Sequence, residues 1–200
     1  MIKNVTKVAV AVAALGFAGL ASAQMMPAST YMGVGVGTTN LKLNSADFAG
    51  VSSKDENDTG YKIFGGYRFS QTWAAEVAYA DLGKASVTFP GGNGSGKATS
   101  WSMAAVGTWP LTGSFGLLAK LGASFNKLET SFNCAGCANA SKNKTDLLWG
   151  VGATYSFTPR VSARLEWEDY GKFGEAVQAT GNQTGRAKAD MLSASVVFSF

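Results

Sequence analysis

Few residue types capable of chemistry occur in this chain. Its two cysteines, Cys134 and Cys137, are separated only by Ala-Gly, and the chain has no histidine. A C-x-x-C pair can form a short disulfide, exchange electrons or bind a metal. Redox exchange needs a helix start that stabilises the thiolate, and a zinc site needs further cysteine or histidine ligands. Because the segment shows no helical pattern and histidine is absent, we expect a disulfide formed in an oxidising compartment.

Two glycine-rich segments resemble nucleotide-binding motifs only in part. Residues 91–97, GGNGSGK, match the start of a phosphate-binding loop, but Ala98 follows where Ser or Thr is required and no helix pattern comes next. We interpret this segment as a flexible loop tip. Residues 33–37, GVGVG, fit a strand with glycine on one face better than a nucleotide fingerprint. The sequence therefore predicts no cofactor and no metal.

Catalysis is also not expected. Without histidine, a serine nucleophile lacks the usual base that activates it near neutral pH. Glu166 and Glu168 lie two residues apart and could form a carboxylate pair, but we expect them to pair with nearby cations. The formal charge of +4 includes Lys3 and Lys7, and the remainder is small and dispersed. This charge does not support nucleic-acid binding.

The first segment has the features of a secretory signal peptide. Lys3 and Lys7 precede an apolar run over 8–20, and Ala21-Ser22-Ala23 gives the small-x-small cleavage pattern. The run is short for a spanning helix, which makes a membrane anchor the weaker alternative. We expect cleavage after Ala23 and a mature domain over 24–200 that has crossed the inner membrane.

From Ser29 onward, apolar and polar residues alternate with the strand period of two. Eight strands are predicted near 30–39, 60–69, 72–82, 98–109, 115–127, 146–157, 160–170 and 188–200. Three connectors are tight, namely 70–71, 110–114 and 158–159. Four are long and polar: LKLNSADFAGVSSKDENDT, GKASVTFPGGNGSGK, KLETSFNCAGCANASKNKT and GKFGEAVQATGNQTGR. Long and short connectors alternate, which is typical of an up-and-down outer-membrane β-barrel with turns in the periplasm and loops outside.

Alternation alone does not say whether the apolar face points inward, as in a soluble lipocalin-like barrel, or outward to lipid. Two features favour lipid. Aromatic residues gather near strand ends, as an interfacial girdle requires; they are Tyr67, Phe69, Trp73, Trp109, Phe115, Tyr155, Phe157, Phe198 and Phe200. The polar face is rich in glycine, which suits the narrow interior of an eight-stranded barrel. We therefore predict an all-β, eight-stranded, antiparallel transmembrane barrel.

Two segments resemble the OmpA-like small outer-membrane barrels. TGYKIFGGYRFSQTWAAEVAYADLG is similar to that family's second and third strands, with a Gly-Tyr-Arg-Phe element, a Glu-containing strand and a terminal Asp-Leu-Gly. The matching positions are Gly66, Tyr67, Arg68, Phe69, Glu76, Asp81, Leu82 and Gly83. WGVGATYSFTPRVSARLEWEDYG is similar to its sixth and seventh strands, joined by a Thr-Pro-Arg turn.

The resemblance implies a cell outer-membrane location in a Gram-negative bacterium, with outer-membrane lipid and lipopolysaccharide as neighbours. The closing strand MLSASVVFSF resembles the carboxy-terminal signal that the barrel-assembly machinery reads, with Phe198 and Phe200 as its aromatic residues. Larger OmpA proteins continue into a peptidoglycan-binding domain, and this chain ends at Phe200, so a cell-wall tether is not expected. We expect a monomer.

Seven charged residues fall on the predicted lumen face: Lys62, Arg68, Glu76, Lys120, Arg164, Glu166 and Glu168. Unpaired charges away from water cost several kcal/mol each, so we expect them to form ion pairs. The pairs could simply fill the lumen, or they could exchange partners in a gated pore. The interior of an eight-stranded barrel is narrow, which argues against constitutive conduction.

These features predict a non-enzymatic outer-membrane protein. It would support the envelope and present four extracellular loops for surface or host ligands. The alternatives are a small pore or a conduit for hydrophobic or small solutes, and a soluble secreted binding barrel.

Overall fold

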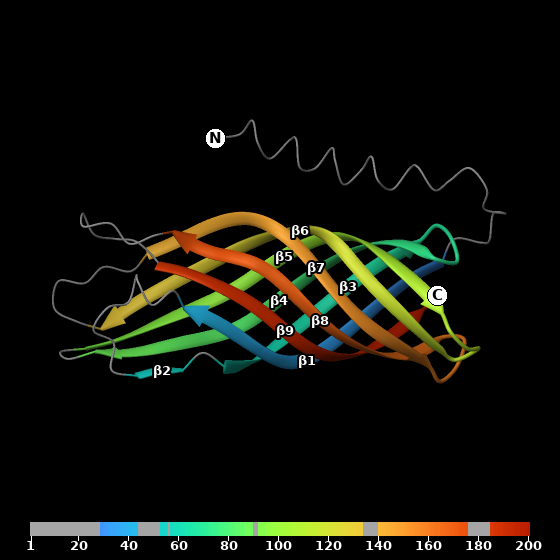
Figure 1. Ribbon diagram of the computed structural model, residues 1–200, viewed down its shortest axis with the longest axis horizontal. Helices are drawn as coiled ribbons and strands as arrows, with labels where there is room; N and C mark the ends of the chain where they lie inside the picture. Colours follow the sequence, from blue (N-terminus) through green and yellow to red (C-terminus); the bar gives the residue numbers. More distant parts are fainter. Residues whose placement is uncertain (1–28, 44–52, 56, 90–91, 134–139, 176–184) are drawn as a thin grey trace, which may run out of the picture.

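The computed structural model describes residues 29–43, 53–55, 57–89, 92–133, 140–175 and 185–200. These residues form a closed antiparallel β-barrel (Figure 1). The long strands are β1 (Ser29–Leu43), β3 (Asn57–Arg68), β4 (Trp73–Phe89), β5 (Gly92–Pro110), β6 (Phe115–Asn133), β7 (Ala140–Ser156), β8 (Val161–Glu175) and β9 (Gly185–Ser199). In the part of the chain that the structure describes, no helix is long and apolar enough to cross a membrane.

Each long strand pairs with its neighbours in sequence, and the pairing of β1 with β9 closes the sheet. In the part of the chain that the structure describes, the short strand β2 (Ser53–Asp55) pairs with the outer end of β4, on the edge of β4 that β3 occupies nearer the turns. The predicted eight-stranded up-and-down barrel is therefore confirmed. The tight turns and the carboxyl end lie at one end of the barrel, and the strand ends that the long connectors join lie at the other, here called the outer end (Figure 1).

The strands extend further toward the outer end than the sequence pattern predicts. The polar segment 83–97 was expected to be a loop, yet most of it continues β4 and β5 as a hairpin, with Lys84 opposite Lys97 and Phe89 opposite Gly92. The interpretation of 91–97 as a flexible loop tip was wrong for Gly92 to Lys97, which belong to β5. Backbone ladders need no apolar side chains, so pairing continues after the alternation ends.

The two faces of the wall are inverted relative to a water-soluble protein. Outward apolar side chains such as Val34, Leu121 and Leu165 are about half exposed, whereas inward Lys62 and Glu166 are buried. A soluble barrel would bury the first set and hydrate the second. This arrangement suits a wall that faces lipid and contradicts the soluble alternative.

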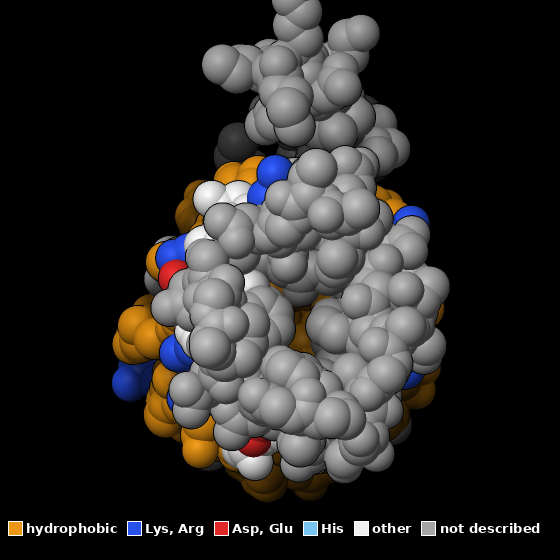
Figure 2. All heavy atoms as spheres, turned by 90° about the vertical axis from the view of Figure 1, so that its left-hand side faces the viewer, with side chains coloured by type: hydrophobic (Ala, Val, Ile, Leu, Met, Phe, Trp, Pro, Cys, Tyr) orange, Lys and Arg blue, Asp and Glu red, His pale blue; other side chains and the backbone are white. Residues whose placement is uncertain are grey.

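Aromatic side chains form two rows on the outward face. One row lies near the turns and includes Trp73 and Trp109, whose rings meet edge to face at 6.3 Å. The other lies toward the outer end and consists of Tyr61, Tyr79, Trp101, Phe125, Trp149 and Trp167. Beyond it, outward positions become polar, at Thr59, Asp81, Thr99, Lys127, Thr145 and Asp169. The two rows mark the interfaces of the membrane, and charged side chains surround the outer end (Figure 2).

Two β-bulges shape the outer half of the barrel. In β4, the register shifts between Asp81 and Lys84, and Gly83 adopts φ 79°. In β8, it shifts between Asp169 and Gly171, which adopts φ 75°. These φ values are in the region that favours glycine. In each case the aspartate accepts a hydrogen bond from the glycine amide two residues later, at 3.1 and 2.9 Å respectively.

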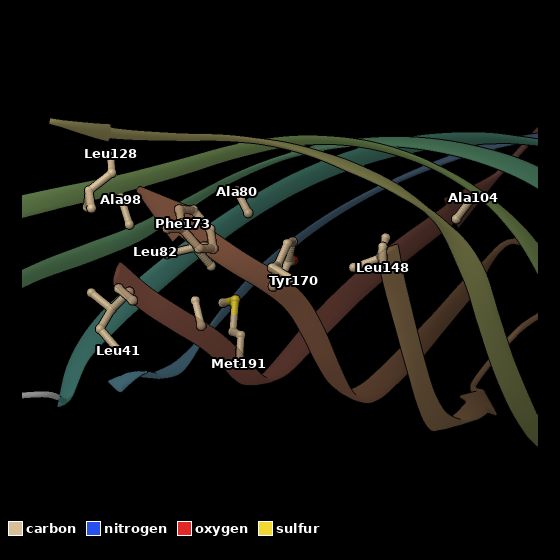
Figure 3. Close-up of a cluster of buried hydrophobic side chains, with 12 residues drawn as sticks. Leu41, Ala80, Leu82, Ala98, Ala104, Leu128, Leu148, Tyr170, Phe173 and Met191 are labelled. Atoms are coloured by element: carbon tan, nitrogen blue, oxygen red, sulfur yellow. The ribbon is translucent and has the colours of Figure 1, made fainter. Parts of the chain in front are cut away.

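Apolar side chains fill the lumen in two separate clusters. The outer cluster lies toward the long connectors (Figure 3) and comprises Leu41, Ala80, Leu82, Ala98, Ala104, Leu128, Leu148, Tyr170, Phe173, Ala187, Ala189 and Met191. The inner cluster lies toward the turns and comprises Tyr31, Phe64, Ala74, Ala78, Val106, Leu118 and Val197. The bulges contribute to the outer cluster, because Leu82 and Tyr170 are the middle residues of the two bulged segments and both are buried.

Candidate functional site: a buried ionic cluster in the lumen

Six of the seven predicted lumen charges meet in one group, here called the ionic cluster: Lys62, Glu76, Lys120, Arg164, Glu166 and Glu168. They come from β3, β4, β6 and β8, whose inward positions bring them together across the barrel. All six are at most 4% exposed. The seventh, Arg68, lies elsewhere.

Lys120 occupies the middle of the ionic cluster. Its Nζ lies 2.6 Å from a Glu76 oxygen, 2.8 Å from Glu168 and 3.0 Å from Glu166. Lys62 donates to both Glu166, at 2.6 Å, and Glu168. Two ammonium groups thus hold three carboxylates, and each glutamate in β8 contacts both lysines.

Arg164 completes the ionic cluster on the side of the turns. It donates to Glu76 at 2.7 Å, and its guanidinium lies 3.7 Å from Glu166. The Tyr31 hydroxyl donates to the same Glu76 oxygen at 2.9 Å. Glu76 therefore receives hydrogen bonds from an ammonium, a guanidinium and a phenol, which together compensate for its lost hydration.

Aromatic rings surround the charges. The Arg164 guanidinium lies 4.8 Å from the Phe64 ring centroid and 5.3 Å from that of Tyr31. Lys62 lies 5.4 Å from the Phe64 ring centroid. On the outer side, the Tyr170 hydroxyl donates to Glu168 at 3.3 Å. The negative ring faces add to the stabilisation of the buried cations.

Glycines make room for this packing. A Cβ at Gly66 would lie 2.2 Å from the Tyr31 ring, and one at Gly152 would lie 2.9 Å from the Glu166 side chain. Distances this short do not occur between nonbonded carbons, so the small residues on the lumen face allow the larger ones to fit. The glycine enrichment of this face thus has a direct steric reason.

Arg68 lies in a vestibule at the turn end of the barrel. Its guanidinium lies 4.9 Å from the Tyr31 ring centroid, and it donates to the Ser199 hydroxyl at 3.4 Å. The vestibule has a volume of about 310 Å³ and is lined mainly by polar residues, Thr154, Ser156 and Ser162 among them. The structure thus separates Arg68 from the other six predicted lumen charges and places it at the turn end of the barrel.

The ionic cluster is consequently charge-balanced, with three cations and three carboxylates. Buried ions lose several kcal/mol of hydration each, so only full pairing makes this arrangement stable. Two of its polar atoms lack a hydrogen bond of good geometry: Arg164 Nε donates none and Glu166 Oε1 accepts none. That glutamate oxygen is nevertheless 3.0 Å from the Lys120 ammonium, so the ionic contact remains.

Sequence reasoning did not identify Tyr31 or Tyr170 as partners of the ionic cluster, since neither is charged. A signal for the bulges was present: Asp-Leu-Gly-Lys at 81–84 and Asp-Tyr-Gly-Lys at 169–172. In each case an aspartate at the same spacing upstream, Asp58 or Asp146, accepts a hydrogen bond from the lysine amide, at 2.7 and 2.9 Å. The same hydrogen bond between the lysine amide and the upstream aspartate therefore occurs at both bulges.

The structure describes only some of the remaining predicted features. Residues 1–23 and the pair Cys134 and Cys137 lie outside the described residues. Phe198 and Phe200 face outward at the turn end, and the Phe200 amide donates to Thr30 O at 2.9 Å. Within the described ranges, no group of three or more metal-ligating side chains could hold an ion.

Comparison with known proteins identifies the family. The model of the OmpA-like transmembrane domain matches residues 26–200. The chain belongs to this family. Among its relatives, outer membrane protein A of Salmonella typhi is 27% identical over 173 residues, which cover 86% of this chain and 49% of that protein. Outer membrane protein A of Escherichia coli O157:H7 is 28% identical over 171 residues, with the same coverage of both chains. The chain thus spans about half the length of these relatives.

Solved structures agree with this OmpA-like assignment at the level of fold. Neisserial surface protein A is similar with a TM-score of 0.60 at 16% identity, covering 88% of this chain and all of that one. Ail of Yersinia pestis, solved in complex with the heparin analogue sucrose octasulfate, is similar with a TM-score of 0.56 at 17% identity and the same coverage. The protein is an outer-membrane β-barrel of a Gram-negative type, as the sequence predicts.

Proposed function

We propose that this protein is a non-enzymatic outer-membrane barrel with a closed lumen, which supports the envelope and presents its outer connections to surface ligands. The observation that carries the proposal is the ionic cluster between two apolar clusters. Lys120 and Glu76 occupy the next inward positions after the inner-cluster residues Leu118 and Ala74 on their strands, and Tyr170 of the outer cluster contacts Glu168. A solute crossing the lumen would have to displace both apolar clusters and break several buried ion pairs, which is unfavourable.

A deletion strain tests the role in the envelope. We expect increased sensitivity to detergent and to bile salts, restored by the wild-type protein. A variant with the ionic cluster intact and shortened outer connectors should restore envelope resistance but lose surface binding. If the deletion strain is as resistant as its parent and binds surfaces equally well, the proposal is wrong.

The second candidate is a gated pore in which the ion pairs exchange partners. It is favoured by one observation: Lys120 contacts three carboxylates and Arg164 contacts two, so alternative pairings exist within the same site. Single-channel recording of the wild-type protein distinguishes the two functions. Discrete conductance steps under applied voltage support the pore, and a silent barrel supports the closed scaffold.

The closing strand supports an assembly role for its final aromatic residues. Phe200 is 74% exposed, and its backbone joins the end of the sheet through Thr30. We propose that Phe198 and Phe200 direct recognition by the barrel-assembly machinery. Deleting Phe200 should reduce the amount of folded, heat-modifiable barrel in the outer membrane, whereas Phe157→Ala, a matched loss of an exposed turn-end aromatic, should not. Equal amounts of the deletion variant and the wild type contradict this role.

The segments outside the described residues contribute two further proposals. Residues 1–23 act as a signal peptide, so the amino terminus of the mature protein should be Gln24 by sequencing. Cys134 and Cys137 form a disulfide in the third long connector, so the folded protein should not react with a thiol reagent until it is reduced. A longer mature amino terminus or two free thiols would overturn these proposals in turn.

A further inference from the structure

The vestibule at the turn end of the barrel carries an excess of positive charge. Arg68 and Arg160 both line it, and no aspartate or glutamate occurs among the described residues of its lining. Within the part of the chain that the structure describes, Arg68 also forms no ion pair with a carboxylate. The vestibule therefore has two guanidinium groups whose charge none of these lining residues balances.

The surroundings of Arg68 suit the binding of an anion. Its guanidinium lies 4.9 Å from the Tyr31 ring centroid and donates to the Ser199 hydroxyl at 3.4 Å. A ring face and one long hydrogen bond compensate for the lost hydration of this half-buried cation less fully than a carboxylate would. An oxyanion in the vestibule would complete the compensation, and the contact would be stronger there than in bulk water.

Arg160 is tied to the same place through Ser199. The Ser199 amide donates to Arg160 O at 2.9 Å. The Thr158 hydroxyl accepts hydrogen bonds from the amides of Arg160 and Val161, at 3.2 and 3.0 Å, which fixes the turn beside the end of β9. Ser199 thus contacts Arg68 through its side chain and Arg160 through its backbone. Because both arginines line the vestibule, we expect one anion to contact both guanidinium groups.

The rest of the vestibule offers hydroxyl groups and little depth. Thr108, Thr154, Ser156 and Ser162 line it from β5, β7 and β8. It ends at the inner cluster, since Val106 is the next inward position after Thr108 on β5. Its volume of about 310 Å³ is at the lower end of the range for small-molecule sites, roughly 300–1,000 Å³. A ligand that fills it would be small and would bond to several hydroxyl groups.

We propose that the vestibule binds a small, water-soluble phosphate monoester of a polyol, which enters from the turn side. The phosphate would contact the Arg68 and Arg160 guanidinium groups, and the polyol would bond to the threonine and serine hydroxyls. A phosphate monoester has a charge of about −1.5 to −2 near neutral pH, which matches two guanidinium groups better than a single carboxylate does. A polyol has no acyl chain, which suits a polar site that the barrel wall separates from lipid. The inference does not depend on whether the lumen conducts.

Isothermal titration of the folded protein in detergent with glycerol 3-phosphate tests the site. Arg68→Gln should weaken binding by about tenfold, since a charge-assisted hydrogen bond is lost. Arg160→Gln changes an exposed turn residue and should weaken binding severalfold. Lys97→Gln is the matched control, because it removes the same charge at the outer end, where Lys97 pairs with Asp81 at 2.8 Å. It should leave binding unchanged. Heat-modifiable migration confirms that the three variants fold.

Comparison ligands decide the chemistry of the site. Ser156→Ala should weaken the binding of glycerol 3-phosphate severalfold and leave that of inorganic phosphate unaltered, because only the ester uses the hydroxyl. Dihexanoyl phosphatidylglycerol, a soluble phosphodiester lipid, should not compete.

The proposal is overturned if glycerol 3-phosphate does not bind, or if Lys97→Gln weakens its binding as much as the two arginine variants do. It is also overturned if Arg68→Gln and Arg160→Gln both bind like the wild type. Inorganic phosphate that binds as tightly as glycerol 3-phosphate, or phosphatidylglycerol that competes as effectively, would likewise contradict it.

Discussion

The ion pairs of the lumen and those of the outer rim have similar distances and very different surroundings. Lys120 and Glu76 lie 2.6 Å apart in the lumen, and Lys127 and Glu129 lie 2.6 Å apart at the rim. The lumen side chains are at most 2% exposed, while those at the rim are about half exposed. Distance is therefore a poor guide to energy here. A buried pair is costly to break because one ion is left without water, whereas an exposed pair exchanges its partner for solvent at little cost.

The largest expected effect comes from removing one buried partner. Lys120→Met leaves three carboxylates against two cations, and it should lower the free energy of unfolding by about 3–5 kcal/mol. Equilibrium urea unfolding in lipid vesicles measures this loss. The double variant Lys120→Met with Glu76→Gln restores charge balance and should recover part of the stability. A loss of less than about 1 kcal/mol in the single variant would place the lumen pairs in the same class as those at the rim.

The two β-bulges lie between the ionic cluster and the outer rim. Substitutions at their glycines should therefore have intermediate effects on the free energy of unfolding. Ala in place of Gly83 must adopt φ near 79° and would place its Cβ 2.5 Å from Asp58 Oδ2. We expect Gly83→Ala to cost about 1–3 kcal/mol of unfolding free energy by the same urea measurement. Gly65→Ala is the control, since its Cβ would meet only Tyr31 O at 3.7 Å. Equal stability of the two variants would show that the bulge is not strained by a side chain.

The smallest effect is expected at the rim. The hydrogen bond from Lys97 to Asp81 raises the pKa of Lys97, and the hydrogen bond from Lys127 lowers the pKa of Glu129. The Lys97 contribution is fully present below the unfolded lysine pKa and is lost as the pH rises through the higher folded value. The Glu129 contribution is present above the unfolded carboxyl pKa and is lost as the pH falls.

From about pH 6 to 9, the rim pairs therefore remain intact. Lys97→Gln should leave the urea midpoint unchanged in this range. The wild-type midpoint should also be insensitive to added salt, because the buried pairs are shielded from it. A measurable fall in stability for Lys97→Gln, or a strong salt dependence of the wild type, would contradict the division between lumen and rim.

Alternation along the strands predicted which side chains share a face, because the period of two fixes this, and the alternating long and short connectors, the aromatic rows and the glycine-rich face together predicted a membrane barrel. The alternation could not give the outer limits of the strands, since the ladder through Lys84 and Lys97 continues among polar residues. The same rule placed Lys62, Glu76 and Glu166 on one face. The alternation could not predict which of these charges contact one another, since strand tilt and register decide their heights in the barrel.

Arg68 shows where the pattern was insufficient. It shares the inward face of β3 with Lys62. Because it is three inward positions nearer the turns, it lies in the vestibule beside Ser199. Tyr31 was also not predicted as a partner, because an uncharged phenol gives no signal in a search for ion pairs. Leu118 and Leu148 are inward apolar residues that depart from the simple alternation, and they help to fill the lumen on either side of the charges.

Single-channel recording in planar bilayers tests the central claim, that a charge-balanced cluster closes the lumen, most directly. Wild-type protein and Lys97→Gln should show no conductance steps, since both retain the ionic cluster. Lys120→Gln should show discrete steps, because the unbalanced carboxylates draw in water and cations. Steps in the wild type, or a silent Lys120→Gln variant shown to be folded by heat-modifiable migration, would contradict the claim.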